Sequence, residues 1–110
     1  MLNFNLINTT PNLIRVIDIN NNILVEIPPS GYILTLEEIS TDCGELNGIP
    51  VVMKRTSVNN ALLVNKASNY IFITTADVAR ELKRPDVVAP NSSMSIIDGI
   101  ITCTGFAVYL

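Results

Sequence analysis

The sequence contains no histidine and only two cysteines among its 110 residues. Histidine is the commonest general base, proton shuttle and metal ligand, so a serine- or cysteine-based triad would need an unusual base. The carboxylates Glu37 with Glu38, and Asp42 with Glu45, could in principle support acid–base chemistry, but a solvated loop face is the simpler explanation. We therefore expect no enzyme and no cofactor, with a weak hydrolase built on Asp86 or Glu45 as the remaining enzymatic alternative.

The motifs of common nucleotide and metal sites are also missing. Neither GxGxxG nor GxxxxGK[ST] occurs, so the standard dinucleotide and triphosphate sites are excluded. Cys43 and Cys103 stand alone, without the spacing of a metal or redox site, and are expected to be small apolar fillers in the reduced state. A small anion with one or two phosphates remains possible, because it needs only an Arg or Lys and a few N–H and hydroxyl donors.

Charge is scarce and slightly acidic. Seven basic and ten acidic residues make up 15% of the chain, whereas 48% is hydrophobic. Such a chain lacks the positive field that duplex nucleic acid requires, and we expect apolar surface that meets a partner, with a homo-oligomer as the natural form. Apolar runs such as Ile23–Ile27 are far shorter than the roughly 20 residues of a membrane span, and MLNFNLIN lacks the features of a signal peptide. We expect one domain over residues 1–110, a cytoplasmic location and no membrane partner.

Alternating apolar residues predict many short β-strands. Leu2, Phe4 and Leu6 indicate a first strand with one buried face, and a strand is expected to restart at Tyr32. Asn and Gly residues separate further strands, with the clearest hairpin turn at Asp98-Gly99. The other expected strands are Leu13–Ile19, Ile23–Ile27, Ile49–Met53, Ala61–Val64, Tyr70–Thr74, Ser95–Ile97, Ile100–Thr102 and Phe106–Leu110.

Only one segment is typical of a helix, Thr75–Lys83. Thr74 or Thr75 can cap it, Asp77 lies in the first turn, and Pro85 ends it. The predicted fold class is mainly β: a small single-domain barrel or sandwich of short strands with one α-helix near 75–83.

Two polar clusters are candidates for ligand binding. Thr10 and Asn12 lie in a proline-held loop between the first two strands, although such a loop can equally satisfy its own backbone. Thr74 and Thr75 place hydroxyls at the helix start, where capping is the alternative. The second cluster runs from the helix into the next loop and consists of Arg80, Arg84-Pro85-Asp86 and Asn91-Ser92-Ser93. In it, Arg84 carries a forked, permanently charged group that either meets an anion or only pairs with Asp86. The predicted ligand-binding residues are Thr10, Asn12, Thr74, Thr75, Arg84, Asp86, Asn91 and Ser92.

Short motifs in a fixed order carry a family resemblance. They are Thr10-Pro11, the PPSG at 28–31, the NGIPVV at 47–52, the YIFI at 70–73, the RPDVVAP at 84–90 and Gly105-Phe106. In this order and spacing the chain resembles a family of small proteins of unknown function encoded by tailed phages and prophages. It departs from the family pattern at Asn12, where a histidine commonly follows the Thr-Pro, and it lacks a Leu-Pro loop before Tyr70.

The resemblance implies a non-catalytic phage accessory protein in the cytoplasm of an infected bacterial host. By analogy with other small acidic phage proteins, it would counter host defence by sequestering a small signalling nucleotide or by inhibiting a host immune protein. Its partner would then be a small anionic nucleotide-like ligand or a host defence protein. The alternative is a structural or decoration protein of the virion, which the high apolar fraction and low charge also suit.

Overall fold

The computed structural model describes residues 4–59, 69–91 and 95–110. Within these ranges the chain forms ten strands and one short helix, which confirms the predicted mainly-β class. The expected strand Ala61–Val64 lies outside the described residues. The elements are β1 Asn5–Asn8, β2 Leu13–Ile17, β3 Ile23–Ile27, β4 Leu36–Leu46, β5 Ile49–Val58, β6 Tyr70–Ile73, α1 Ala76–Leu82, β7 Val87–Asn91, β8 Ser95–Ile97, β9 Ile100–Cys103 and β10 Gly105–Val108.

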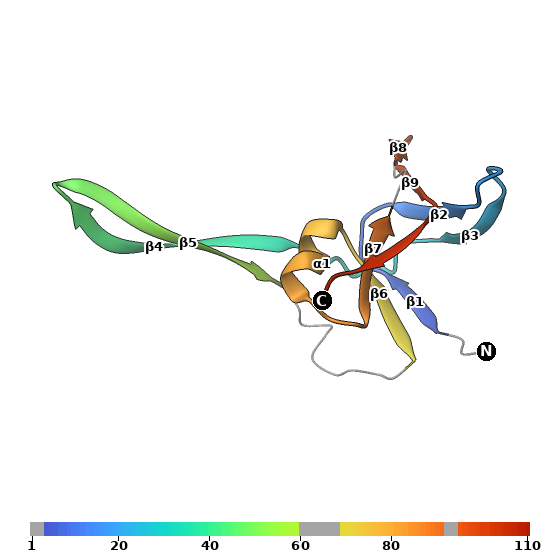
Figure 1. The fold of residues 1–110 in the computed structure, drawn as a ribbon, viewed down its shortest axis with the longest axis horizontal. Helices are drawn as coiled ribbons and strands as arrows, with labels where there is room; N and C mark the ends of the chain where they lie inside the picture. The colour runs from blue at the N-terminus through green and yellow to red at the C-terminus, as the bar shows by residue number, and fades with distance from the viewer. Residues whose placement is uncertain (1–3, 60–68, 92–94) are drawn as a thin grey trace.

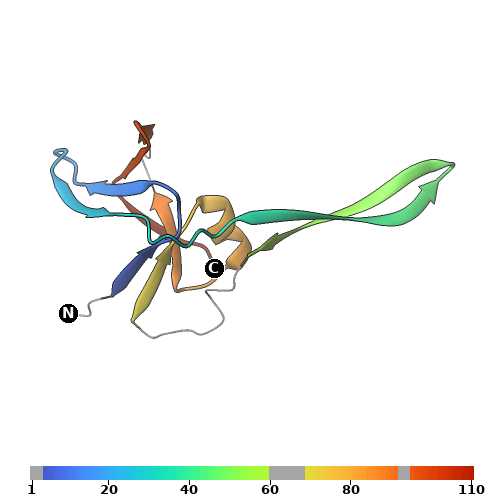
Figure 2. The same cartoon turned by 180° about the vertical axis from the view of Figure 1, so that it is seen from behind.

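Eight of the strands form two four-stranded sheets (Figures 1 and 2). We call the sheet with the order β1-β6-β7-β10 sheet A, and the sheet with the order β3-β2-β9-β8 sheet B. Both are mixed: β1, β6 and β7 run parallel with β10 antiparallel to β7, while β2 is parallel to β9 and antiparallel to β3. Neither sheet closes on itself, so of the two predicted architectures the sandwich fits the described chain and the barrel does not.

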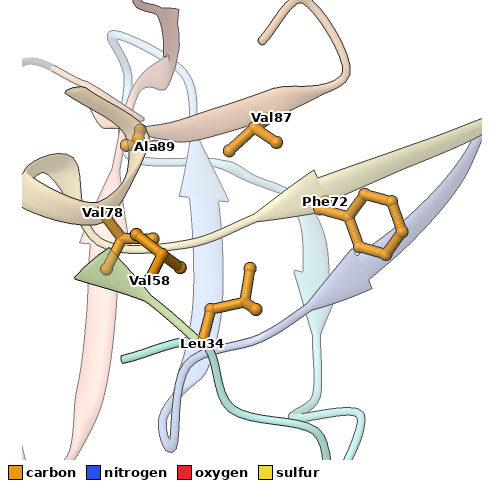
Figure 3. Close-up of a cluster of buried hydrophobic side chains, with 7 residues drawn as sticks. Leu34, Val58, Phe72, Val78, Val87 and Ala89 are labelled. Carbon is orange, nitrogen blue, oxygen red and sulfur yellow. The ribbon is translucent and has the colours of Figure 1, made fainter. Parts of the chain in front are cut away.

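Sheet A is the central layer, and each of its faces carries part of the core. On one face, Phe72 and Val87 pack with Val78 of α1, with Leu34 and with Val58 at the end of β5 (Figure 3). On the other face, Ile73 and Val88 pack against sheet B, which contributes Ile14, Val16, Ile27, Ile101 and Cys103. Neighbouring residues of β6 and β7 therefore point into different halves of the core, as strand alternation requires.

The helix forms where the sequence predicts it. Thr75 is the N-cap residue and α1 spans Ala76–Leu82, so the expected range includes one capping residue at each end. The C-cap is Lys83, in the left-handed region at φ 50°, and its N–H bonds to the carbonyl of Ala79. This conformation ends the helix two residues before Pro85.

The remaining two strands form an arm that leaves the body. β4 and β5 pair only with each other, around the turn Asn47-Gly48, and we call residues 36–58 the arm. It projects beyond α1 and makes the molecule 60 Å long, against 32 and 25 Å in the other directions (Figure 1). The radius of gyration is 17.3 Å, whereas a compact domain of this length has about 13 Å.

Three local expectations differ from the structure. Phe4 and Leu6 are 45% and 39% exposed, so the predicted inner face of the first strand is wrong: Ile7, on the other side of β1, packs against the core. The strand expected to begin at Tyr32 begins instead at Leu36, because residues 32–35 do not form a ladder of backbone hydrogen bonds with another strand. The carboxylates expected on a loop face lie on the exposed strand β4.

Candidate functional site

Thr10 lies in a largely buried cluster of hydrogen bonds just after β1. We call this cluster, formed by Asn8, Thr10 and Asn12, the knot. Its backbone N–H and its hydroxyl both donate to Oδ1 of Asn8, at 2.9 and 2.7 Å. The Nδ2 of Asn8 donates to the carbonyls of Asn12 and Ile27, at 2.7 and 3.0 Å. Asn8 and Thr10 are 1% and 2% exposed, so the hydroxyl predicted for a ligand is engaged inside the protein.

Asn12 stands at the surface end of this knot. Its Nδ2 donates to the carbonyl of Gly99 at 2.9 Å and thereby ties the loop after β1 to the turn between β8 and β9. The bond links segments 87 residues apart in the chain. Sequence reasoning identified Asn12 but missed Asn8, and the available signal was an amide at the end of an apolar strand, directly before Thr-Thr-Pro.

Thr74 and Thr75 follow β6 and lie beside the same knot. The hydroxyl of Thr9 donates to the carbonyl of Ile73 at 2.7 Å, and the N–H of Thr74 donates to the carbonyl of Val88 at 2.9 Å. Thr74 is fully buried, and among the described residues its Oγ1 is the buried side-chain oxygen without a hydrogen-bond partner. The structure thus brings Thr10 and Thr74 into one region, at the ends of paired strands β1 and β6.

At the helix start, the Thr75 side chain forms a hydrogen bond with the Asp77 carboxylate. Its hydroxyl makes no capping bond to the helix backbone. Hydrogen bonding from that hydroxyl, and then from the Val78 N–H at 3.0 Å, holds the pKa of the Asp77 carboxyl below its usual value. Thr75 is exposed, so its side chain stays at the surface.

Arg84 and Asp86 form a closed pair at the start of β7. The guanidinium binds the carboxylate through two bonds, Nε to Oδ1 at 2.9 Å and Nη2 to Oδ2 at 2.6 Å. Both side chains are largely buried, at 20% and 13% exposure. Of the two roles expected for Arg84, binding an anion or pairing with its neighbour, this geometry matches the second.

Asn91 is the last residue of β7, where it pairs with Gly105 and is exposed. Five residues of strand, roughly 16 Å, separate it from Asp86. Ser92 lies outside the described residues. The predicted donors therefore gather only in part: Thr10, Asn12 and Thr74 surround the knot, while Arg84 and Asn91 mark the two ends of β7.

The arm is the most exposed part of the described chain, and sequence reasoning missed it as a functional element. Its large apolar side chains include Leu46, Ile49 and Met53, at 68%, 65% and 59% exposure. The one signal was the length of the pattern around Asn47-Gly48, where strand residues extend well beyond the usual five or six on each side.

An open groove lies where the arm joins the body. It is lined by Glu38, Lys54, Arg55 and Thr56 of the arm and by Glu81 of α1. Lys54 contacts Glu38 at 3.3 Å, and both side chains are 59% exposed. Opposite charges alternate around the groove, so it offers no single-sign field for an anion or a cation.

The remaining chemistry is sparse. The described residues contain no group of three or more Cys, Asp or Glu side chains arranged to hold a metal ion. Cys103 is buried, which raises the pKa of its thiol, whereas Cys43 is exposed on the arm with its Sγ 3.4 Å from the carbonyl of Val51.

α1 falls far short of the length that a bilayer requires, and the described ranges contain no longer helix.

Comparison of the chain with protein families, with curated proteins and with solved structures finds no match.

Proposed function

We propose that this protein is a non-catalytic structural subunit that works by packing against neighbouring proteins through its arm. The observation that carries the proposal is the exposure of the arm on both faces. Every residue from 37 to 50 is exposed, including large apolar side chains at its tip. Exposed apolar surface of this extent marks a site of protein contact.

The energetics of the arm support the same conclusion. An isolated two-stranded hairpin is marginally stable in water and gains stability when its faces pack on another layer. Among the described residues, only the base of the arm packs on the body, through Val58 and Leu36 in the core cluster beneath α1. A neighbouring protein would supply the missing layer along the rest of the arm.

Given the resemblance to phage proteins, the assembly we propose is the virion. The high apolar fraction and low charge suit repeated packing against other subunits. Mass spectrometry of purified particles tests this: we expect the protein in stoichiometric amounts. Its absence from washed particles, with abundant protein in the infected cell, would overturn the proposal.

Sequestration of a small anionic nucleotide, or direct inhibition of a host immune protein, remains a prediction of the sequence analysis. Among its proposed donors, Thr10 and Arg84 are engaged by Asn8 and Asp86, so the structure offers this function less support than packing. Thermal melting with cyclic oligonucleotides and ADP-ribose derivatives tests the first version. A melting shift with one of them would favour sequestration over a structural role.

A further inference from the structure

The register of the arm separates its side chains into two unlike faces. In an antiparallel pair, directly opposed residues point to the same side, and the side alternates along each strand. Ile39 opposes Arg55, Thr41 opposes Met53, and Leu46 opposes Ile49. On β5, residues 49, 51, 53 and 55 therefore share one side. We call this side the apolar arm face: Ile39, Leu46, Ile49, Val51 and Met53.

The other side of the arm is polar. It carries Glu38 opposite Thr56, Ser40 opposite Lys54 and Asp42 opposite Val52. The apolar arm face holds aliphatic and thioether side chains, together with Thr41, and its two charged residues, Glu37 and Arg55, both lie near its base. Burial does not explain the segregation within the chain, because Ile39, Met53 and Leu46 are 36%, 59% and 68% exposed.

We propose that the apolar arm face packs against the same face of a second copy of this chain, with the two arms antiparallel about a two-fold axis. Face-to-face packing of two hairpins gives a four-stranded, two-layer core with the sheets about 10 Å apart. An isologous contact needs a surface that complements itself, and the part of the apolar arm face from Ile39 to the tip, which carries no charge, does so.

The positions of the charged base and the apolar tip decide the relative direction of the arms. Arms packed in parallel would place Glu37 and Arg55 of one copy against the same charged residues of the other, near the base of both. In the antiparallel arrangement, the tip residues Leu46 and Ile49 instead lie over Ile39 and the aliphatic stem of Arg55 in the second copy. Each arm then covers the least protected part of the other.

The exposed surface is large enough for a stable dimer. The chain exposes 7396 Å², whereas a compact monomer of 12.0 kDa exposes about 6,000 Å². The excess belongs to the chain as a whole, to which both faces of the arm contribute, and it is greater than the ~800 Å² that each partner buries in an interface of standard size. The inference rests on the proposed function in one respect, that the arm works by packing on protein.

Sedimentation equilibrium of the purified full-length chain tests the proposal with two matched variants. Met53→Glu places a charge on the apolar arm face, and Val52→Glu places the same charge one residue away on the polar side, at a similarly exposed position. We expect a wild-type dimer, an increase in dimer Kd of about 30-fold or more for Met53→Glu, and a dimer unchanged within about twofold for Val52→Glu.

A wild-type chain that stays monomeric, a higher oligomer, or equal dissociation by both variants would overturn the proposal. Cys43 gives a second readout, because it is the exposed thiol and its Sγ lies 3.4 Å from the carbonyl of Val51. Its labelling should slow as wild-type concentration rises and should not slow in Met53→Glu. A monomer that is stoichiometric in virions would refute only this inference, and a dimer absent from virions would refute only the proposed function.

Discussion

Oδ1 of Asn8 accepts two hydrogen bonds from Thr10, one from its backbone N–H and one from its hydroxyl. With the two bonds that its Nδ2 donates to the carbonyls of Asn12 and Ile27, the amide uses its full bonding capacity in a site that is 1% exposed. It joins β1, the following loop and β3 into one unit.

Replacing Asn8 with alanine should destabilise the protein by about 2–4 kcal/mol, because buried carbonyls and the Thr10 hydroxyl lose their partners together. The check is the free energy of unfolding from urea titration. Asn12→Ala is the matched control: it removes a bond at the surface, to Gly99, and should cost less than about 1 kcal/mol. Similar losses for both variants would contradict the role assigned to the knot.

Two neighbouring threonines should respond oppositely to the same change. The Thr74 hydroxyl is buried without a partner, so Thr74→Val should leave stability unchanged or raise it by up to about 1 kcal/mol. The Thr9 hydroxyl donates to Ile73, so Thr9→Val should lower stability by about 1 kcal/mol. Melting temperatures of the two variants would decide, and a clear loss for Thr74→Val would mean that its hydroxyl has a partner.

The Arg84–Asp86 pair should contribute more to stability than the surface pair Arg15–Glu26. Asp86→Ala leaves a largely buried guanidinium without its carboxylate, at a cost of about 1–3 kcal/mol. Glu26→Ala breaks an ion pair whose side chains are 33% and 42% exposed, and should cost less than about 1 kcal/mol. Urea titrations that rank the two variants in the reverse order would contradict this assignment.

Acid should weaken the start of α1. The pKa of Asp77 is lowered in the folded protein, so its charged form adds stability above the pKa of the unfolded chain, and this is lost as pH falls through the folded pKa. Asp77→Asn should therefore lower stability at pH 7 by a few tenths of a kcal/mol and make little difference at pH 2. Unfolding at both pH values measures the change, and an equal effect at each would rule out the charge as its cause.

The two thiols should differ in reactivity. Burial raises the pKa of Cys103, so it should react slowly with an aromatic disulfide reagent in the folded protein, and Cys43 should account for the fast phase. Cys43→Ser should remove that fast phase. A raised pKa favours the protonated thiol in the folded state, so this contribution to stability is lost as pH rises above about 9.

Local signals were sufficient for the turns and the helix. Asn47 and Asp98 adopt positive φ before Gly48 and Gly99, as the dipeptides predict, and α1 lies within Thr75–Lys83. Such features depend on a few adjacent residues, which the sequence displays directly.

Features that depend on distant residues were harder to predict. The parallel pairing of β2 with β9 joins segments more than 80 residues apart, and the bonds of Asn8 are made by carbonyls of a loop and of another strand. Alternation along 36–58 predicts strands but does not say whether another layer covers them. The site residues were therefore identified singly, and their partners emerged only from the structure.

The pairing of β2 with β9 also constrains the order of assembly during synthesis. Ile14 and Val16 gain their neighbours Ile101 and Cys103 only after β9 has been translated, more than 80 residues after β2. Until then, β2 can pair with β3 alone, and its other edge is open to wrong partners in the nascent chain.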